Sequence, residues 1–189
     1  MIGPSFPELL AAAQRGDQQA FAVLWRDLHP AVLRYLRVAA PSAAEDLAAD
    51  SWLSIIDSLG RFGGDERAFR AWVFTVARHR AIDWHRRSAR RRTEPLGPEL
   101  AGERAAPDDP AAEVMEAEAT RAALALLATL PPSQAEVVAL RVLDGLEVAE
   151  VAQITGRRPS AVRVLAHRGL RRLAGRLAST RGTERRVTR

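Results

Sequence analysis

The sequence predicts an all-α fold of two small helical domains joined by an acidic, proline-rich flexible linker, with a helix-turn-helix in the C-terminal domain. Ala, Leu and Arg dominate, and no stretch of alternating β-branched residues appears, which favours helices over strands. Prolines, acids and glycines interrupt the helical periodicity between residues 93 and 112. Near the C-terminus a short helical pattern, a glycine-containing turn and a basic helical pattern follow one another, which is typical of a helix-turn-helix.

These signals divide the chain into four segments. We expect an N-terminal domain over residues 1–92, a linker over 93–112, a C-terminal domain over 113–178 and a disordered basic tail over 179–189. The chain has 189 residues, of which 47% are hydrophobic, so it can bury a substantial core.

Turn residues separate the first helices. Gly16 closes a short helix, and Asp17 can cap the next, whose apolar side begins with Phe21 and Leu24. The pair His29-Pro30 predicts a break, after which the apolar pattern resumes and continues to Pro41.

A further helix is expected from Ser42, which forms a capping-box pattern with Glu45, to about Leu59, with Gly60 as its stop. The spacing of four and seven residues places three aspartates on one side of this helix, and Leu53 accompanies them: Asp46, Asp50 and Asp57. An acidic side with an apolar residue can dock a partner protein. An ordinary solvated face is the alternative.

The most basic stretch covers residues 63–92. From Arg67 to Arg92 it holds nine arginines, four aromatic residues and one acid, Asp83. At 100° per residue, one helical face is apolar and the opposite face mixes arginines with an aromatic ring. The apolar face comprises Phe69, Trp72, Val73, Val76 and Ala77. The basic face comprises Arg70, Phe74, Arg78, Ala81 and His85. Such a face suits single-stranded nucleic acid, since arginines contact phosphates and a ring stacks on a base. The alternative is a solvated arginine face.

The C-terminal domain begins with a helix expected from about residue 111 to 128, followed by a turn at Pro131-Pro132. Ser133 and Glu136 form a second capping-box pattern, and Gly145 ends the helix that follows. The helix-turn-helix then comprises residues 147–154, a turn at 155–158 and a basic helix that starts at Pro159.

Charge and composition narrow the class of protein. Residues 93–120 carry one arginine against eight acids, whereas residues 157–189 carry eleven arginines against one acid. Two basic segments separated by an acidic one indicate two DNA-binding surfaces. The chain has no cysteine, no apparent secretion signal and no apolar run long enough to span a bilayer, so we expect a cytoplasmic protein without membrane insertion. All 28 basic residues are arginine, for which a G- and C-rich genome is the simplest explanation.

Two other classes of protein are alternatives. A stand-alone DNA-binding regulator would need only the helix-turn-helix and would leave the basic stretch at 63–92 unexplained. An enzyme would need a catalytic or metal site, but His85 points away from His79 and Asp83 on a helix, and Asp83 can pair instead with Arg80, Arg86 or Arg87. We therefore expect no catalysis, no metal and no cofactor.

Four pieces of the sequence occur together in a specific order: Ala44-Glu45-Asp46-Leu47, residues 69–78, Arg80-Ala81-Ile82-Asp83, and Leu130-Pro131-Pro132 followed by the helix-turn-helix. Their order and spacing, over about residues 8–175, resemble the extracytoplasmic-function sigma factors of bacterial RNA polymerase. The resemblance implies a protein that directs core polymerase to specific promoters and opens the DNA for transcription initiation. It also implies a first domain that binds the polymerase clamp and opens the minus-ten element of the promoter. The second domain is expected to lie near the polymerase flap and to read the minus-thirty-five element. A separate anti-sigma protein is the expected regulatory partner.

The resemblance assigns roles by position. The polymerase-binding positions are Asp46, Asp50 and Leu53. The positions for minus-ten recognition and strand opening are Phe62, Arg67, Arg70, Phe74, Arg78, Arg80, His85, Arg86 and Arg87, with the loop at 62–67 holding a flipped base. The positions for minus-thirty-five recognition are Arg157, Arg158, Ser160, Arg163, His167, Arg168 and Arg171. Two residues depart from the pattern: Arg158 stands where Ser or Thr usually caps the recognition helix, and Gly169 is expected to weaken or bend that helix.

Overall fold

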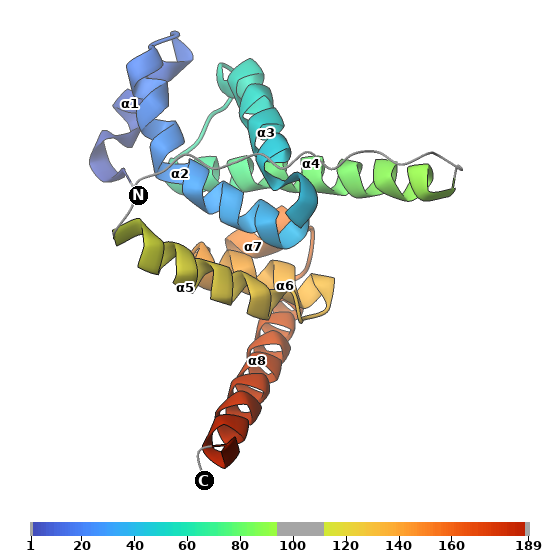
Figure 1. Cartoon of the computed structure of the whole chain (residues 1–189). Coiled ribbons are helices and arrows are strands. Elements are labelled where there is room, and N and C mark those ends of the chain that lie inside the picture. The colour runs from blue at the N-terminus through green and yellow to red at the C-terminus, as the bar shows by residue number, and fades with distance from the viewer. Residues whose placement is uncertain (1, 94–111, 188–189) are drawn as a thin grey trace.

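The computed structural model describes residues 2–93 and 112–187, and within these ranges every regular element is a helix (Figure 1). The predicted all-α fold is therefore confirmed. The N-terminal half contains η1 (Gly3–Ser5), α1 (Phe6–Gln14), α2 (Gln18–Ala39), η2 (Pro41–Ala43), α3 (Ala44–Leu59) and α4 (Glu66–Thr93). The C-terminal half contains α5 (Ala112–Leu127), α6 (Pro132–Val138), the π-helical turn η3 (Ala139–Leu143), α7 (Val148–Thr155) and α8 (Pro159–Val187). Almost all of the predicted linker lies outside the described residues.

Local signals set several helix ends as expected. The Asp17 side chain accepts hydrogen bonds from the backbone N–H groups of Gln19 and Ala20 at 2.8 and 3.1 Å, which caps α2. Gly156 ends α7 with a φ of +65°, a left-handed conformation that glycine adopts without steric cost.

Pro30 does not break the second helix, contrary to the prediction. α2 continues through it from Gln18 to Ala39. Leu28 and Val32 on either side are 3% and 0% exposed. Burial of this continuous apolar side holds the helix together although Pro30 lacks the N–H donor of an interior helical residue.

The two predicted capping boxes are also wrong, and the cause is the same in both. Pro41 and Pro132 occupy first-turn positions, where a missing N–H is harmless, so Ser42 and Ser133 lie inside helical turns and not at an N-cap. Their intended acidic partners bind arginines instead: Glu45 lies 3.2 Å from Arg37, and Glu136 contacts the N-terminal half.

One hydrophobic core runs through both halves of the molecule. Residues of α2 and α4 share it with residues of α6, η3, α7, α8 and the segment before α7. The C-terminal half contributes Val137, Leu140, Leu146, Val151, Ala152, Ile154 and Val162. In Figure 1, α6 and α7 lie against α2 and α4, while α8 and the end of α4 project away from the body. The C-terminal half therefore covers one side of the N-terminal half.

Gly169 has a packing role that the sequence did not indicate. A Cβ at this position would lie 2.6 Å from Cγ2 of Val138, so only glycine permits α8 to cross α6 this closely. The helix continues past it to Val187, through the segment where we expected a disordered tail. No helix within the described ranges is long and apolar enough to cross a bilayer.

Candidate nucleic-acid and partner interfaces

The orientation of α4 differs from the prediction at its central aromatic residue. Phe74 is not on an open basic face: it is 0% exposed, and its ring meets that of Tyr35 edge-on at 5.8 Å. α4 packs against α2 and α3 on one side and against α7 on another, so its buried sector is wider than one apolar stripe. In this conformation Phe74 cannot stack on a base.

Trp72, which we expected in the core, is only partly buried. Its ring stacks on Phe62 at 5.0 Å, and Phe62 in turn meets Phe69 edge-on at 5.3 Å. The aromatic rings next to the 62–67 loop are thus Phe62 and Trp72. The sequence pattern missed Trp72 as a candidate for base stacking because the ring falls at the margin of the apolar stripe.

The arginines at the N-terminal and central part of α4 bind the C-terminal half. Arg67 forms an exposed ion pair with Glu147 at 2.8 Å. Arg70 donates to the backbone carbonyl of Asp144, and Arg78 donates through Nε to Oε1 of Glu136 at 2.7 Å. These three arginines belong to the predicted strand-opening surface, and we call them the proximal arginines.

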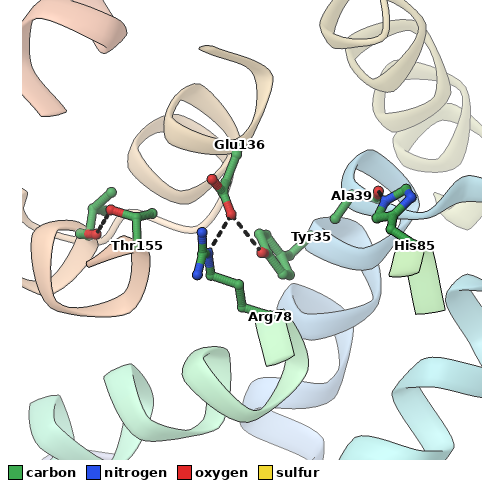
Figure 2. Close-up of polar contacts among 7 residues, drawn as sticks. Tyr35, Ala39, Arg78, His85, Glu136 and Thr155 are labelled. Atoms are coloured by element: carbon green, nitrogen blue, oxygen red, sulfur yellow. Dashed lines mark hydrogen bonds and ion pairs between the residues drawn. The ribbon is translucent and has the colours of Figure 1, made fainter. Parts of the chain in front are cut away.

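Figure 2 shows that Glu136 bridges two elements of the N-terminal half. Its Oε1 accepts the hydrogen bond from Arg78 and a second one from the Tyr35 hydroxyl at 3.2 Å. Burial and the neighbouring Glu136 carboxylate raise the pKa of Tyr35 well above its ordinary value. Tyr35 is therefore a hydrogen-bond donor to Glu136 at every physiological pH.

Asp144 is the most deeply placed acid of this contact, with a side chain that is 0% exposed. Its Oδ1 lies 3.3 Å from Arg34 of α2, while its Oδ2 and the Nε of Arg70 are buried without a hydrogen-bond partner among the described residues. Burial raises the pKa of Asp144 to about 7, although Arg34 and Arg70 oppose the shift. The carboxylate therefore lies in a site that favours its neutral form.

The distal end of α4 carries an open basic surface, formed by Arg80, Asp83, Arg86, Arg87 and Arg90. Arg80 donates to the Ser54 hydroxyl, and Arg86 pairs with Asp83 at 3.6 Å, which confirms the predicted pairing of Asp83 with an arginine. The Nε2 of His85 lies 2.8 Å from the Ala39 carbonyl oxygen (Figure 2). His85, Arg86 and Arg87 are exposed, whereas Arg70 and Arg78 are partly covered by the C-terminal half.

The second basic surface, on α8 and the turn before it, is fully open. All seven predicted positions are exposed, namely Arg157, Arg158, Ser160, Arg163, His167, Arg168 and Arg171. Val162 on the opposite side is 0% exposed and joins the core. α8 thus has the one-sided burial of a recognition helix that presents its basic side to a groove.

A third surface lies on α3, on the side predicted to bind a partner protein. Asp46 and Asp50 are exposed, and Leu53 is 62% exposed. Two further large apolar residues are exposed: Ile56 of α3 is 50% exposed, and Trp25 of the neighbouring helix α2 is 37% exposed and stacks on His29. An exposed apolar patch bordered by acids is typical of a protein-protein contact.

Comparison with known proteins relates both halves of the chain to one family. Residues 24–91 match the family model of Sigma-70 region 2, and residues 120–173 match Sigma-70, region 4. The chain is 33% identical over 180 residues to the ECF RNA polymerase sigma factor SigD of Mycobacterium tuberculosis, with 92% of this chain and 84% of the relative covered. It is 36% identical over 169 residues to the ECF RNA polymerase sigma factor BldN of Streptomyces coelicolor, covering 88% of this chain and 64% of BldN.

Solved structures share the fold. The sigma factor RpoE of Bartonella quintana, in complex with the anti-sigma factor NepR, superposes with a TM-score of 0.64 at 20% identity, covering 84% of this chain and 96% of the other. CnrH in complex with the cytosolic domain of CnrY gives 0.63 at 20% identity, with 90% and 96% covered.

The fold and the family matches place the chain in the sigma-70 family. Within that family it belongs to the ECF RNA polymerase sigma factors, the group of the curated relatives that it matches over most of its length. It is therefore a promoter-directing factor for transcription initiation.

Proposed function

We propose that this sigma factor uses each of the three surfaces described above for a different contact. The α3 surface binds the clamp of core RNA polymerase, α4 and the 62–67 loop recognise and open the minus-ten element, and the exposed side of α8 reads the minus-thirty-five element in the major groove. The observation that carries this proposal is the pair of arginine-rich helices, α4 and α8, on separate halves of a chain that matches sigma regions 2 and 4.

The protein acts by binding and not by catalysis, within the cytoplasm where core polymerase works. Its partners are core polymerase, through the clamp and the flap, promoter DNA, and an anti-sigma factor. The structural neighbour RpoE is a sigma factor that was solved in complex with the anti-sigma factor NepR, which supports the last of these. The chemistry required of the chain is phosphate and base recognition by arginine, for which it needs no metal or cofactor.

The direct test is transcription by core polymerase on a genomic promoter library, with and without this protein. We expect new start sites that appear only when both are present. A stand-alone regulator would instead bind its sites tightly and specifically in the absence of core, and that result would contradict the proposal.

The clamp assignment has its own test in Asp46→Arg/Asp50→Arg. Both positions are exposed, so we expect unchanged helical content and weaker capture of core polymerase. Glu8→Arg on α1, also exposed, is the control for added positive charge. If capture of core is unchanged, the α3 surface is merely solvated.

A further inference from the structure

Helix α1 is attached to the loop that precedes α4 through the side-chain amide of Gln14. Its Nε2 donates hydrogen bonds to the backbone carbonyl oxygens of Leu59 and Phe62, at 3.0 and 2.8 Å. A carbonyl oxygen only accepts hydrogen bonds, so only the NH2 end of the amide can face this pair. Gln14 thereby ties the last residue of α3 to the start of the 62–67 loop.

Two further contacts attach the N-terminal segment to the other end of this loop, at the start of α4. The Glu66 carboxylate accepts hydrogen bonds from the backbone N–H groups of Ile2 and Gly3. The ring of Phe6, which is 2% exposed, lies 5.5 Å from the ring of Phe69 between centroids. The segment before α2 therefore contacts both ends of the loop.

The loop is closely packed between these attachments. The Phe62 ring stacks on Trp72 at 5.0 Å. A Cβ at Gly64 would lie 3.1 Å from Cζ of Phe62 and 2.9 Å from Cβ of Ala68, so the backbone passes too close for a larger residue. Oδ1 of Asp65 accepts a hydrogen bond from the backbone N–H of Ala68 at 2.8 Å. A shift of the Phe62 backbone would therefore move the ring pair and the loop together.

We propose that Gln14 is a positioning residue for recognition of the minus-ten element: it contacts no DNA, but it fixes the 62–67 loop in the geometry that receives an unstacked base. This inference rests on the proposed role of that loop, and it adds α1 to the elements that determine base preference. The match to Sigma-70 region 2 begins at residue 24, so it does not cover this helix.

The physical reason is that order in the free loop improves binding. A loop that is ordered before it holds a base loses less conformational entropy on binding. It also keeps its polar and aromatic groups in place, and a displacement of about 1 Å is enough to weaken such contacts. Gln14 is half-buried, and it acts on backbone atoms 45 and 48 positions further along the chain.

The test compares two substitutions of Gln14 that differ in whether a hydrogen-bond donor remains. Gln14→Glu keeps the size of the side chain but places a carboxylate, which has no donor, against two carbonyl oxygens. Gln14→Lys keeps donors at the end of a slightly longer side chain. Gln19→Glu and Gln19→Lys, at an exposed position of the neighbouring helix α2, make the same changes in net charge and serve as controls.

The first measurement is hydrogen exchange of the backbone over residues 59–68 in the free full-length chain. We expect exchange that is about tenfold faster in Gln14→Glu, because the loop opens more often when its anchor is lost. Gln14→Lys and both controls should exchange at rates close to those of the wild type. Wild-type rates in Gln14→Glu would show that the loop is held without this amide and would overturn the inference.

The second measurement uses the holoenzyme and the non-template minus-ten strand of a promoter found with the genomic library. Oligonucleotides that carry each of the four bases at each position give the base preference, and 2-aminopurine fluorescence reports which base is unstacked. For Gln14→Glu we expect binding that is weaker by about fivefold and a base preference at one position that is reduced by a similar factor. Gln14→Lys and both controls should keep the wild-type preference, because general charge attraction does not distinguish bases.

A purely structural role for Gln14 would give a different result. Lower stability in urea with an unchanged base preference in Gln14→Glu would contradict the inference. An equal loss of preference in Gln14→Glu and Gln14→Lys would also contradict it, since the donor would then not matter. Capture of core polymerase should be unchanged in every variant, and a loss of capture that accounts for the weaker DNA binding would count against the positioning role.

The same measurements separate this inference from the proposed function. If the wild-type holoenzyme shows no base preference in the minus-ten strand, the proposed role of the 62–67 loop fails and the positioning role fails with it. If the wild type shows a preference and Gln14→Glu retains it, only the positioning role is wrong.

Discussion

α4 and α8 carry similar basic sequences, but their basic residues differ in how exposed they are. The seven predicted DNA-reading positions at α8 are all exposed, whereas Arg70 and Arg78 on α4 are covered by the C-terminal half and Phe74 is 0% exposed. α4 packs against α2 and α3 and also against α7 of the C-terminal half, whereas α8 packs against α6 and α7 and leaves its basic positions exposed. A basic helical face is therefore open only where no further segment of the chain packs against it.

The largest expected effect tests whether Phe74 is core. Phe74→Ala should lower the free energy of unfolding by about 3–5 kcal/mol, because it removes a buried ring that packs on Tyr35. His167→Ala at an exposed position of α8 should change stability by less than about 0.5 kcal/mol. Urea unfolding followed by circular dichroism measures both. If both variants lose a similarly small amount of unfolding free energy, Phe74 is exposed and does not belong to the core.

The next effect tests how closely α8 packs against α6. Gly169→Ala introduces a Cβ 2.6 Å from Val138, so we expect a loss of about 1–3 kcal/mol from overpacking against α6. Gly175→Ala is the matched control on the same helix, since no atom lies within 4 Å of its added Cβ. There the better helix propensity of alanine should stabilise the protein by up to about 1 kcal/mol. A stabilising Gly169→Ala would mean that α8 does not cross α6 this closely.

Arg163→Ala sharpens the assignment of the open face of α8. If Arg163 contacts a base edge, the variant should lose about 1–3 kcal/mol of promoter binding and relax the preference at one position of the minus-thirty-five element. Holoenzyme binding to a set of single-base promoter variants measures this. A uniform loss on all of them would identify a phosphate contact.

The smallest effect is a pH dependence of stability that comes from Asp144. In the folded chain the pKa of Asp144 is about 7, above the ordinary value of 3.8 that it should recover on unfolding, so the folded chain binds the proton more tightly. The free energy of unfolding should therefore rise as pH falls from 8 to 6 and decrease as pH rises through 7, by at most about 1.4 kcal/mol per pH unit. Arg34 and Arg70, the cations that face Asp144, stay charged throughout.

Urea unfolding at pH values between 6 and 8 measures this pH dependence directly. Asp144→Asn is the control, because an amide does not titrate in this range and should remove the dependence between pH 6 and 8. An unchanged pH dependence in Asp144→Asn would assign the effect to another group, such as His29, whose pKa is lowered by burial and by Arg37.

Much of the fold follows from local chemistry, so the sequence alone determined it. Asp17 caps α2 through its own neighbours' N–H groups, Gly156 adopts a left-handed turn, and Pro159 opens α8. The exposed positions on α8 were also predictable, because a single apolar side containing Val162 faces the core and leaves the basic side to solvent.

The tertiary structure decided what periodicity could not. Pro30 remains within a helix because the residues around it are buried together, and Glu136 leaves a predicted cap to bind Arg78 and Tyr35. Gly169 serves the approach of Val138 from another helix. Arg70 and Arg78 became partly covered because the C-terminal half packs against α4, and Phe74 became buried against Tyr35 of α2. A helix's sequence records which residues share a face, but burial is set by all the segments that pack against it, and those come from distant parts of the chain.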